Sequence, residues 1–352
     1  MSRYVKINFK YFKESIFITV IGFIAAFFWS EHVSAGSGLM GLFAVCVLSV
    51  LEVSLSFDNA VINAMKLEHM TQLWQHRFLT WGILIAVFGM RFLFPILVVS
   101  VFTGLGMLSV TKIALFDSIK YSSYLQLTHA PIVTFGGMFL MMLFWAYFSD
   151  KEKDIHWIKH VEAPLTKVGN IKGICLFLCM LFLILTVYFQ PQSAQKNVFF
   201  AGLSGIITYL IIDNVSNFLE KKDEKMIAEG IKRGGLVSFL YLELIDASFS
   251  LDGVLGAFAI SRDIIIIMIG LGIGAMFVRS LTVMLVEKKV LKQFLYLEHG
   301  AHWAIGALSV IMLMTTVMEV PEFVTGTIGL IFILSALYSS IKYNRDMDKK
   351  IC

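Results

Sequence analysis

The sequence predicts an all-α, polytopic transmembrane helical bundle of about ten spans with an inverted-topology repeat. Of its 352 residues, 58% are hydrophobic and only 15% are charged, whereas soluble domains are about a quarter charged. Apolar segments of about 20 residues, the length that crosses a bilayer as a helix, recur along the chain. Two matching acidic motifs, far apart in the sequence, indicate that the chain contains a duplication.

The ten expected spans follow the apolar segments in order. Pro95 falls inside the third of them and predicts a kink. The basic residues before 15–29, followed by Val33-Ser34-Ala35, resemble a cleaved signal peptide, but we expect a retained first helix because the repeat needs it. The spans are about 15–32, 39–64, 80–103, 130–149, 171–190, 197–219, 235–260, 264–286, 301–318 and 323–342, and the stretch 104–128 is expected to be the longest outer segment without a span.

The basic residues predict the orientation of the spans. With the N-terminus inside, 23 of the 29 lysines and arginines fall in inner segments and four in outer segments. Inner loops of membrane proteins carry such an excess. We therefore expect a protein of the cell inner (plasma) membrane with both termini cytoplasmic. The net charge of +4 predicts no nucleic-acid partner, since the basic residues lie in short loops between spans.

The two acidic motifs share one pattern: acid, any residue, Ser, apolar, Ser, apolar, Asp, then Asn or Gly. The first runs from Glu52 to Asn59 as EVSLSFDN, and the second from Asp246 to Gly253 as DASFSLDG. Acidic residues inside a membrane span are costly and are functional candidates by default. Serine pairs bend helices by bonding to the backbone, so both motifs predict a local distortion.

Other landmarks repeat in the same order. The motifs are 194 residues apart, Gly82 to Arg91 matches Gly270 to Arg279 at 188, and 125–130 matches 295–300 at 170. We predict a first five-span repeat at 1–190, with its core at 39–149, and a second at 191–352, with its core at 235–318. The matching motifs lie in spans that are five apart and therefore run in opposite directions. Transporters with such inverted repeats bind substrate at the midplane between the halves.

An oxygen-lined cation site follows from the motif side chains, since hard divalent cations such as Mn²⁺, Mg²⁺ and Ca²⁺ prefer carboxylate, amide and hydroxyl oxygens. The motifs contain no His or Cys, which disfavours zinc or copper. We predict no tightly bound cofactor. The candidate ligands are Glu52, Asp58, Asn59, Asp246 and Asp252, supported by Ser54, Ser56, Ser248 and Ser250, with Arg91 and Arg279 as counter-ions or gates.

Structural explanations stand beside these assignments. The acids could pair with Arg91 and Arg279 without binding an ion, or serve only in protonation. His129 and His299 hold matching places in the repeat, which suggests gating or a proton relay, although histidines at helix ends often only pack. Asp213 could line a vestibule or end a helix. Glu298, His299 and His302, or His156 with His160, have spacings that could hold a metal. Gly270-x-Gly272-x-Gly274 predicts close helix packing.

The run Glu52-x-x-Leu55-Ser56-x-Asp58-Asn59-Ala60 resembles the signature of the TerC-like integral membrane family, named for tellurium resistance. The stretch 298–306 and Leu251-Asp252-Gly253-Val254 look like a branch catalogued mainly as a domain of unknown function. The resemblance covers about 40–340 and implies a place among the LysE-like transporters and manganese export. Gly253 departs from it, since it stands where the first copy has Asn59.

Together these features predict a transporter that exports Mn²⁺ or a similar cation by alternating access, with protons as a plausible counter-ion. Its partners would be the bilayer and the cation, and no oligomeric state is predicted. A non-transporting platform of a tellurite or metal stress-resistance complex, or an exporter of a cationic organic solute, are the alternatives. No enzyme is predicted: Walker A, HExxH and GxSxG motifs are absent, and Asp58 and Asp252 lack the sequence contexts of intramembrane aspartyl proteases.

Overall fold

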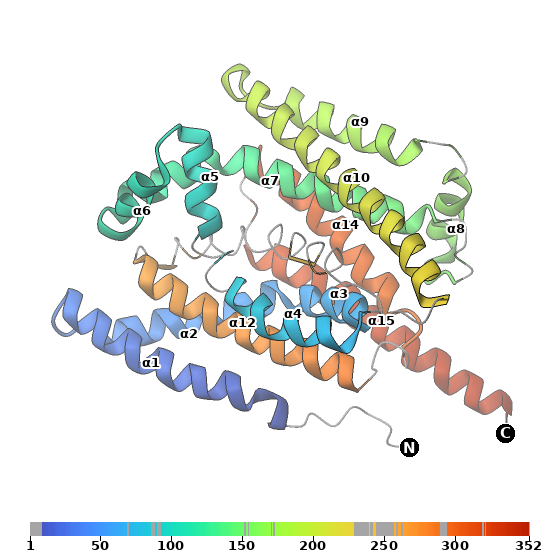
Figure 1. Ribbon diagram of the computed structural model, residues 1–352, viewed down its shortest axis with the longest axis horizontal. Coiled ribbons are helices and arrows are strands. Elements are labelled where there is room, and N and C mark those ends of the chain that lie inside the picture. Colours follow the sequence, from blue (N-terminus) through green and yellow to red (C-terminus); the bar gives the residue numbers. More distant parts are fainter. Residues whose placement is uncertain are drawn as a thin grey trace. The chain divides into compact units, whose positions relative to one another are not determined.

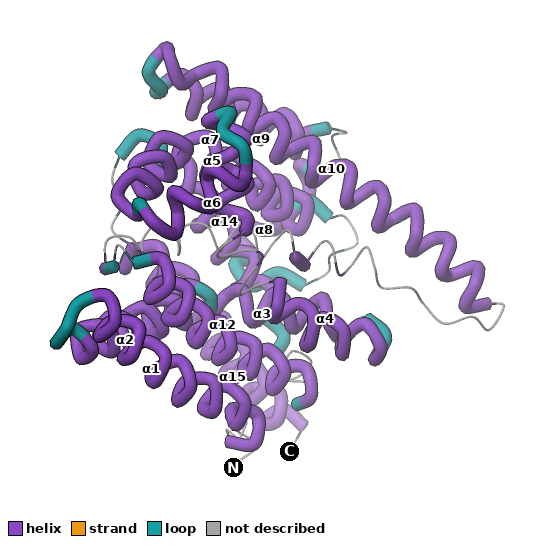
Figure 2. The backbone as a smooth tube through the Cα atoms, turned by 60° about the vertical axis from the view of Figure 1, so that its left-hand side comes forward, coloured by secondary structure: helices purple, strands orange, loops and turns teal. Residues whose placement is uncertain are grey.

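The computed structural model describes residues 9–351, apart from 69, 86–88, 90–92, 151, 152, 154, 170, 172, 229–238, 240, 241, 244–256, 258, 259, 262, 289–293, 319 and 321. In this part of the chain every regular element is a helix, and no strand occurs (Figure 2). Five of the described helices are long and apolar enough to cross a membrane, namely Phe9–Val33, Gly38–Leu55, Ile119–Phe148, Gln192–Val215 and Ile264–Glu287. The chain is thus all-α and has the character of a multi-pass membrane protein; the count of ten spans stays a prediction.

The chain divides into two compact units, each made of two stretches of sequence. The first unit comprises residues 1–129 and 234–288, and the second comprises 130–233 and 289–352. Each unit therefore combines segments from both predicted repeats. The repeat boundary near residue 190 is not a boundary between compact units, and the repeats themselves stay a prediction.

The first unit is built around α12 (Ile264–Glu287). This helix packs against α1 (Lys13–Val33), α2 (Gly38–Leu55) and α3 (Phe57–Glu68) (Figure 1). Val45 and Leu48 of α2 and Leu271 and Ile273 of α12 form a buried apolar cluster with Ala26 of α1. The apolar side chains hold α2 and α3 against one partner, which fixes the position of the first acidic motif.

Two glycines of α12 bring its backbone close to α2. A Cβ added at Gly270 would lie 2.5 Å from the Leu48 Cβ, and one added at Gly274 would lie 2.5 Å from the Glu52 Cβ. Real Cβ atoms do not approach so closely, so only glycine permits this distance between the helices. The close packing predicted from the glycine-rich run is confirmed at these two positions.

The third predicted span differs in detail from its prediction. It contains α4 (Gln72–Leu84) and α5 (Phe94–Thr103), with π-helical backbone at Ile85, Gly89 and Leu93 between them. Pro95 lies in the first turn of α5, after Leu93, whose φ of −69° and ψ of −42° are helical. The irregular backbone thus lies next to the proline, and the kink expected at Pro95 stays a prediction.

The segment 104–128 is largely helical. It holds α6 (Met107–Phe116) and the first turns of α7 (Ser118–Phe148), which continues into the second unit. Val110 and Ala114 of α6 pack with Tyr121 and Leu125 of α7. The fourth span therefore begins earlier than expected, because apolar contacts extend its helix toward the N-terminus.

The second unit contains α8 (Lys159–Val168), α9 (Ile174–Tyr188), α10 (Gln192–Ala228), α14 (Leu297–Thr315) and α15 (Glu322–Ile351). α9 packs along α10, and α14 along α15 (Figure 1). The second half of α7 packs on α14, where the Ser309 hydroxyl donates to the Gly137 carbonyl at 2.9 Å. This arrangement places the inner loop with α8 beside the start of α14.

Candidate functional site

The first acidic motif lies where the second predicted span is divided into two helices. α2 ends at Leu55, α3 begins at Phe57, and Ser56 between them has φ −105° and ψ 14°. The Ser56 N–H donates to the Glu52 carbonyl at 2.9 Å, and the Ala60 N–H donates to the Ser56 carbonyl at 3.1 Å. These bonds are the last of α2 and the first of α3, so Ser56 is the point where the helix is interrupted. The distortion predicted from the serines is confirmed for this copy.

Glu52 is a buried acid, with only 1% of its surface exposed. The Ser56 hydroxyl donates to its Oε1 at 2.7 Å, and Gly274 of α12 lies directly against its side chain. A carboxylate is costly to bury unless it is paired, hydrogen-bonded or bound to a metal. Its retention inside a helix pair that is otherwise apolar makes Glu52 the first candidate ligand.

The rest of the motif is carried by α3. Asp58 lies in the first turn, but its side chain is outside the described part of the structure. Asn59 is 1% exposed, and Asn63, one turn later, is 5% exposed. The motif did not predict Asn63. Its signal in the sequence is the spacing of four from Asn59, which places both amides on one helix face.

The second motif cannot be placed. Asp246, Ser248, Ser250, Asp252 and Arg91 lie outside the described residues, so the convergence of four carboxylates stays a prediction. Within the described residues, no group of three or more His, Cys, Asp or Glu is positioned to hold a metal. The described part of the first motif, with the next turn of α3, offers the Glu52 carboxylate and the amides of Asn59 and Asn63, and these oxygen donors fit a hard divalent cation.

Two supporting residues have surroundings that differ from their predictions. Ser54 is exposed, whereas Glu52 and Ser56 are buried, so this serine lies on a different face of α2. Arg279 Nη1 pairs with Glu14 Oε2 of α1 at 2.6 Å. Glu14 is 265 residues from Arg279 and reaches it because α1 packs along α12. The predicted pairing of Arg279 with the motif acids stays a prediction, since the side chains of Asp58, Asp246 and Asp252 lie outside the described part of the structure.

The predicted gating and vestibule residues lie on long helices. His129 is half-buried on α7, and Asp213 is half-buried on α10. These positions leave their roles as predictions. His299 is buried in the first turn of α14, and its ring takes part in a polar cluster that the sequence did not predict.

That cluster is centred on Glu162 of α8, which is 1% exposed. Its Oε2 accepts hydrogen bonds from His299 Nδ1 at 2.8 Å and from the Trp157 N–H at 2.8 Å. Its Oε1 accepts from Trp303 Nε1 at 2.9 Å. His156 Nδ1 lies 3.9 Å from Oε2. Because an ionised carboxylate only accepts, His299 Nδ1 is the donor in its pair.

The pKa of the Glu162 carboxyl reflects two opposing effects. Burial raises it, but the hydrogen bonds from His299 and Trp303, the charge of His299 and the Trp157 N–H together lower it from 4.5 to about 2. Glu162 is therefore ionised at physiological pH, and protein donors engage both of its oxygens. The contacts indicate a structural clamp between α8 and α14.

Aromatic rings surround a lysine beside this clamp. Lys153 Nζ lies 3.1 Å from the ring centroid of Tyr147 and 4.5 Å from that of Phe148. The His302 ring stacks on Tyr147 with 3.4 Å between centroids and 3° between planes, so the lysine and the histidine take opposite faces of one ring. Burial lowers the pKa of Lys153 from 10.5 to about 8, although Glu162 and other nearby acids oppose the shift.

These contacts argue against a metal bound by Glu298, His299 and His302. His299 Nδ1 holds Glu162, and His302 Nδ1 is 2.9 Å from the Glu298 carbonyl. Glu298 itself is exposed. Among the residues that the structure describes, the three side chains form no metal-holding group, because the two histidines have different partners and Glu298 is exposed.

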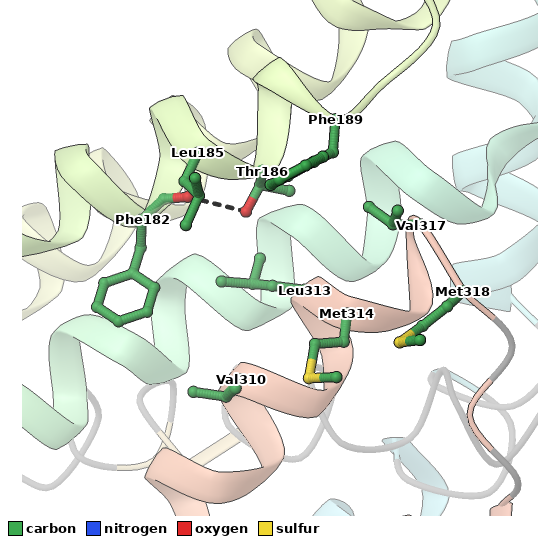
Figure 3. A pocket seen from close by; sticks show the side chains of 9 residues that line it. All are labelled: Phe182, Leu185, Thr186, Phe189, Val310, Leu313, Met314, Val317 and Met318. Atoms are coloured by element: carbon green, nitrogen blue, oxygen red, sulfur yellow. Dashed lines mark hydrogen bonds between the residues drawn. The ribbon is translucent and has the colours of Figure 1, made fainter.

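A cavity of about 300 Å³ lies between α9 and the end of α14 (Figure 3). Phe182 and Phe189 line it from α9, and Leu313, with Met314, lines it from α14. The Thr186 hydroxyl, its one polar group, donates to the Phe182 carbonyl at 2.8 Å. Such a lining offers no ligands for a cation, so this cavity is not the predicted site.

Comparison with known proteins gives one match. The family described as "Protein of unknown function (DUF475)" matches residues 57–347, which is most of the chain. No curated protein and no solved structure matches. The matched region begins at α3, directly after the break at Ser56, and includes Asn59 and Asn63 of the first unit.

Proposed function

The chain belongs to this family of unknown function, DUF475, and from its own residues we propose that it exports a divalent metal cation through the cell inner membrane. Mn²⁺ is the favoured cargo, with Mg²⁺ and Ca²⁺ as alternatives. The cation would bind at the bilayer midplane and cross by alternating access, in exchange for protons. The proposed ligands are Glu52, Asp58, Asn59, Asp246 and Asp252.

The observation that carries the proposal is the buried Glu52 carboxylate at the helix break. It lies between α2 and α12, beside the hydroxyl of Ser56, and is about two and three turns from the buried amides of Asn59 and Asn63. Interrupted helices in transporters bind ions at the interruption, where side chains and backbone both supply oxygens. A purely structural acid would need no such break.

Helix packing in the first unit supports the inverted repeat. α2 meets α12 at Leu48 and Gly270. The repeat offset of 194 relates Leu48 to residue 242 of the second copy, and the offset of 188 relates Gly270 to Gly82 of the first copy. In the structure, Gly82 lies against Glu243, because a Cβ added there would be 3.0 Å from Glu243 Oε1. The contact of Gly270 with Leu48 thus has a counterpart, to within one residue, in the contact of Gly82 with Glu243. A pseudo-two-fold axis that relates the two repeats requires such paired contacts.

The second unit supports the same symmetry. A Cβ added at Gly306 would overlap the Phe144 ring, and one added at Gly137 would lie 3.0 Å from Leu313. The repeat offset of 170 relates Gly306 to residue 136 and Phe144 to residue 314. The symmetry therefore predicts a contact between residues 136 and 314, and the observed contact, between Gly137 and Leu313, is one residue away at each end. The two helices are the fourth and ninth predicted spans. Matched contacts in both units favour a duplicated architecture with about ten spans.

The motif residues support the choice of cargo. Their oxygens suit hard cations, and the resemblance of Glu52 to Ala60 to the TerC-like signature favours manganese export. The distribution of basic residues favours cytoplasmic termini, so the cation would enter from the cytoplasm. A carboxylate site also suits proton exchange, since the acids can take up protons when the cation leaves.

Uptake into inverted vesicles that contain the purified protein tests the proposal. The wild-type protein should accumulate Mn²⁺ inside the vesicles when protons flow out of them. Glu52→Gln and Asp58→Asn should abolish this uptake. Losing even an outer-shell partner costs roughly 10–100-fold in metal affinity, so loss of a ligand should cost at least that. Asp346→Asn, which changes an exposed carboxylate on α15, is the matched control.

The alternatives give different results in the same experiment. A stress-resistance platform would bind no divalent cation, and its deletion would leave the metal content of cells unchanged. An exporter of a cationic organic solute would transport no Mn²⁺ but would still lose its activity on Glu52→Gln. Mn²⁺ uptake by both acid variants at the wild-type rate would contradict the proposed ligands.

A further inference from the structure

A buried polar stripe runs along α2 and α3. It consists of Glu52, Ser56, Asn59 and Asn63, whose spacings of four, three and four place them on one helix face. Their exposed fractions are 1%, 7%, 1% and 5%. The helix is interrupted at Ser56, and the stripe residues before and after the interruption are all buried. At 1.5 Å per residue the stripe is about 16 Å long.

Asn63 is a polar residue among buried apolar ones. Its neighbours on α3 include Ile62, Ala64 and Leu67, which are all buried. Asn63 Oδ1 is itself buried, and no residue in the described part of the chain donates a hydrogen bond to it. A structural amide in an apolar interior normally has its acceptor satisfied. An acceptor left open in this way suits a ligand that arrives from outside.

α3 is held firmly in this position. On α12, Thr282 is 2% exposed, and its hydroxyl lies 3.4 Å from the Ala60 carbonyl and 3.0 Å from the Val278 carbonyl. These contacts hold α3 against α12 at Ala60, one turn before Asn63.

We infer that this polar stripe is the cytoplasmic access path for the exported cation, and that the Asn63 amide oxygen is the first protein ligand to replace its water. The inference rests on the proposed export function. The second predicted span runs from outside to inside, so Asn63 lies on the cytoplasmic side of Glu52. The cation would pass from Asn63 to Asn59 and then to the carboxylate.

The chemistry of the stripe suits passage and selection. Its outer ligands are neutral amides, which bind a cation weakly enough to release it to the next site. Mg²⁺ gives up its water reluctantly and requires near-ideal octahedral geometry. Single oxygens spaced along a helix cannot provide that geometry, so the path should favour Mn²⁺ over the more abundant Mg²⁺.

The test separates access from binding. Initial Mn²⁺ uptake into inverted vesicles reports access from the cytoplasmic face, and Mn²⁺ titration of the detergent-purified protein reports the central site. Asn63→Leu, which keeps the size of the side chain without its oxygen, should lower the initial rate at low Mn²⁺ about tenfold. Its Mn²⁺ dissociation constant should stay within about twofold of the wild-type value, because the central ligands are unchanged.

Two further variants complete the experiment. Asn63→Asp keeps an oxygen ligand, so it should retain Mn²⁺ uptake. Its added charge should let Mg²⁺ bind more readily, so the variant should discriminate less between Mn²⁺ and Mg²⁺. This variant also tests the path if Asn63→Leu does not fold. Asn197→Leu, at an exposed asparagine of α10, should behave as wild type. A wild-type rate in Asn63→Leu, or equal losses of rate and binding, would overturn the access path alone. A wild-type protein that neither binds nor moves Mn²⁺ would refute the export function, and the path with it.

Discussion

Replacing Glu162 with glutamine should destabilise the second unit strongly. Three donors converge on this carboxylate: His299 Nδ1, the Trp157 N–H and Trp303 Nε1. Glutamine keeps the shape but presents an NH₂ group in place of one oxygen. That group would face either a ring N–H or an indole N–H, so one buried donor is left without an acceptor and the charge that stabilises His299 is lost.

Two routes give the size of the effect. Lowering the pKa of the Glu162 carboxyl from 4.5 to about 2 corresponds to ~3 kcal/mol at ~1.4 kcal/mol per unit. Leaving a buried donor without its acceptor costs ~1–3 kcal/mol. The routes agree. Because folding lowers this pKa, the contribution is complete above pH 4.5 and is lost as the pH falls toward 2, so the full effect is present at pH 7.

Thermal unfolding of the full chain in detergent measures this loss. At ~2–4 °C per kcal/mol for a chain of this size, Glu162→Gln should lower the Tm by about 6–12 °C at pH 7. Glu298→Gln is the matched control, since Glu298 is an exposed acid of α14 next to His299. If both variants unfold at the same temperature, the clamp does not stabilise the unit. With Trp303→Phe, a double-mutant cycle should give a coupling of ~0.5–3 kcal/mol.

Two other substitutions test features of the separate units. Gly274→Ala would place a Cβ 2.5 Å from the Glu52 Cβ, and this overpacking should lower the free energy of unfolding by ~1–3 kcal/mol. Gly106→Ala, whose Cβ would have no atom within 4 Å, is the control and should have no effect. Equal Tm values for the two variants would contradict the close approach of α2 and α12. Since burial lowers the pKa of Lys153 from 10.5 to about 8, the unfolded chain binds more protons in that range, so stability should rise between pH 8 and 10.5. Lys153→Met should remove that rise. If the stability of the variant depends on pH as that of the wild type does, Lys153 does not stay buried against the Tyr147 ring in solution.

Local features of the first unit were predictable from the sequence. The serines of the first motif predicted the break at Ser56, because hydroxyls compete with the helix for backbone carbonyls. Gly270 and Gly274 predicted a close helix contact, because glycine has no side chain to keep a neighbouring helix away. Both the helix break and the close contact depend on the residue itself and on the nearest turn, so the sequence alone indicates them. The membrane class followed from composition, since apolar segments of this length have few other uses.

Pairings between distant residues were not predictable. Glu162 and His299 are 137 residues apart, and Arg279 and Glu14 are 265 apart. Each partner is one of several acids or bases of the same type, so composition and spacing cannot select the pair. The packing of α8 on α14 and of α1 on α12 makes the selection. The sequence hypothesis therefore did not identify Glu14 as a partner of Arg279, and it did not identify Glu162.

The comparison of the two buried glutamates shows what distinguishes a binding site from a clamp. Both Glu52 and Glu162 are 1% exposed, so burial alone does not separate them. Glu162 accepts from a histidine, an indole and a backbone N–H, which supply the positive charge and hydrogen bonds that an ionised carboxylate needs. Glu52 Oε1 accepts from the Ser56 hydroxyl, and Asn63, three turns further along, has an open acceptor oxygen. A cation at Glu162 would have to displace protein donors, whereas the Asn63 oxygen is open to a ligand. This difference is the reason to assign a stabilising role to Glu162 and to propose cation transport along α2 and α3.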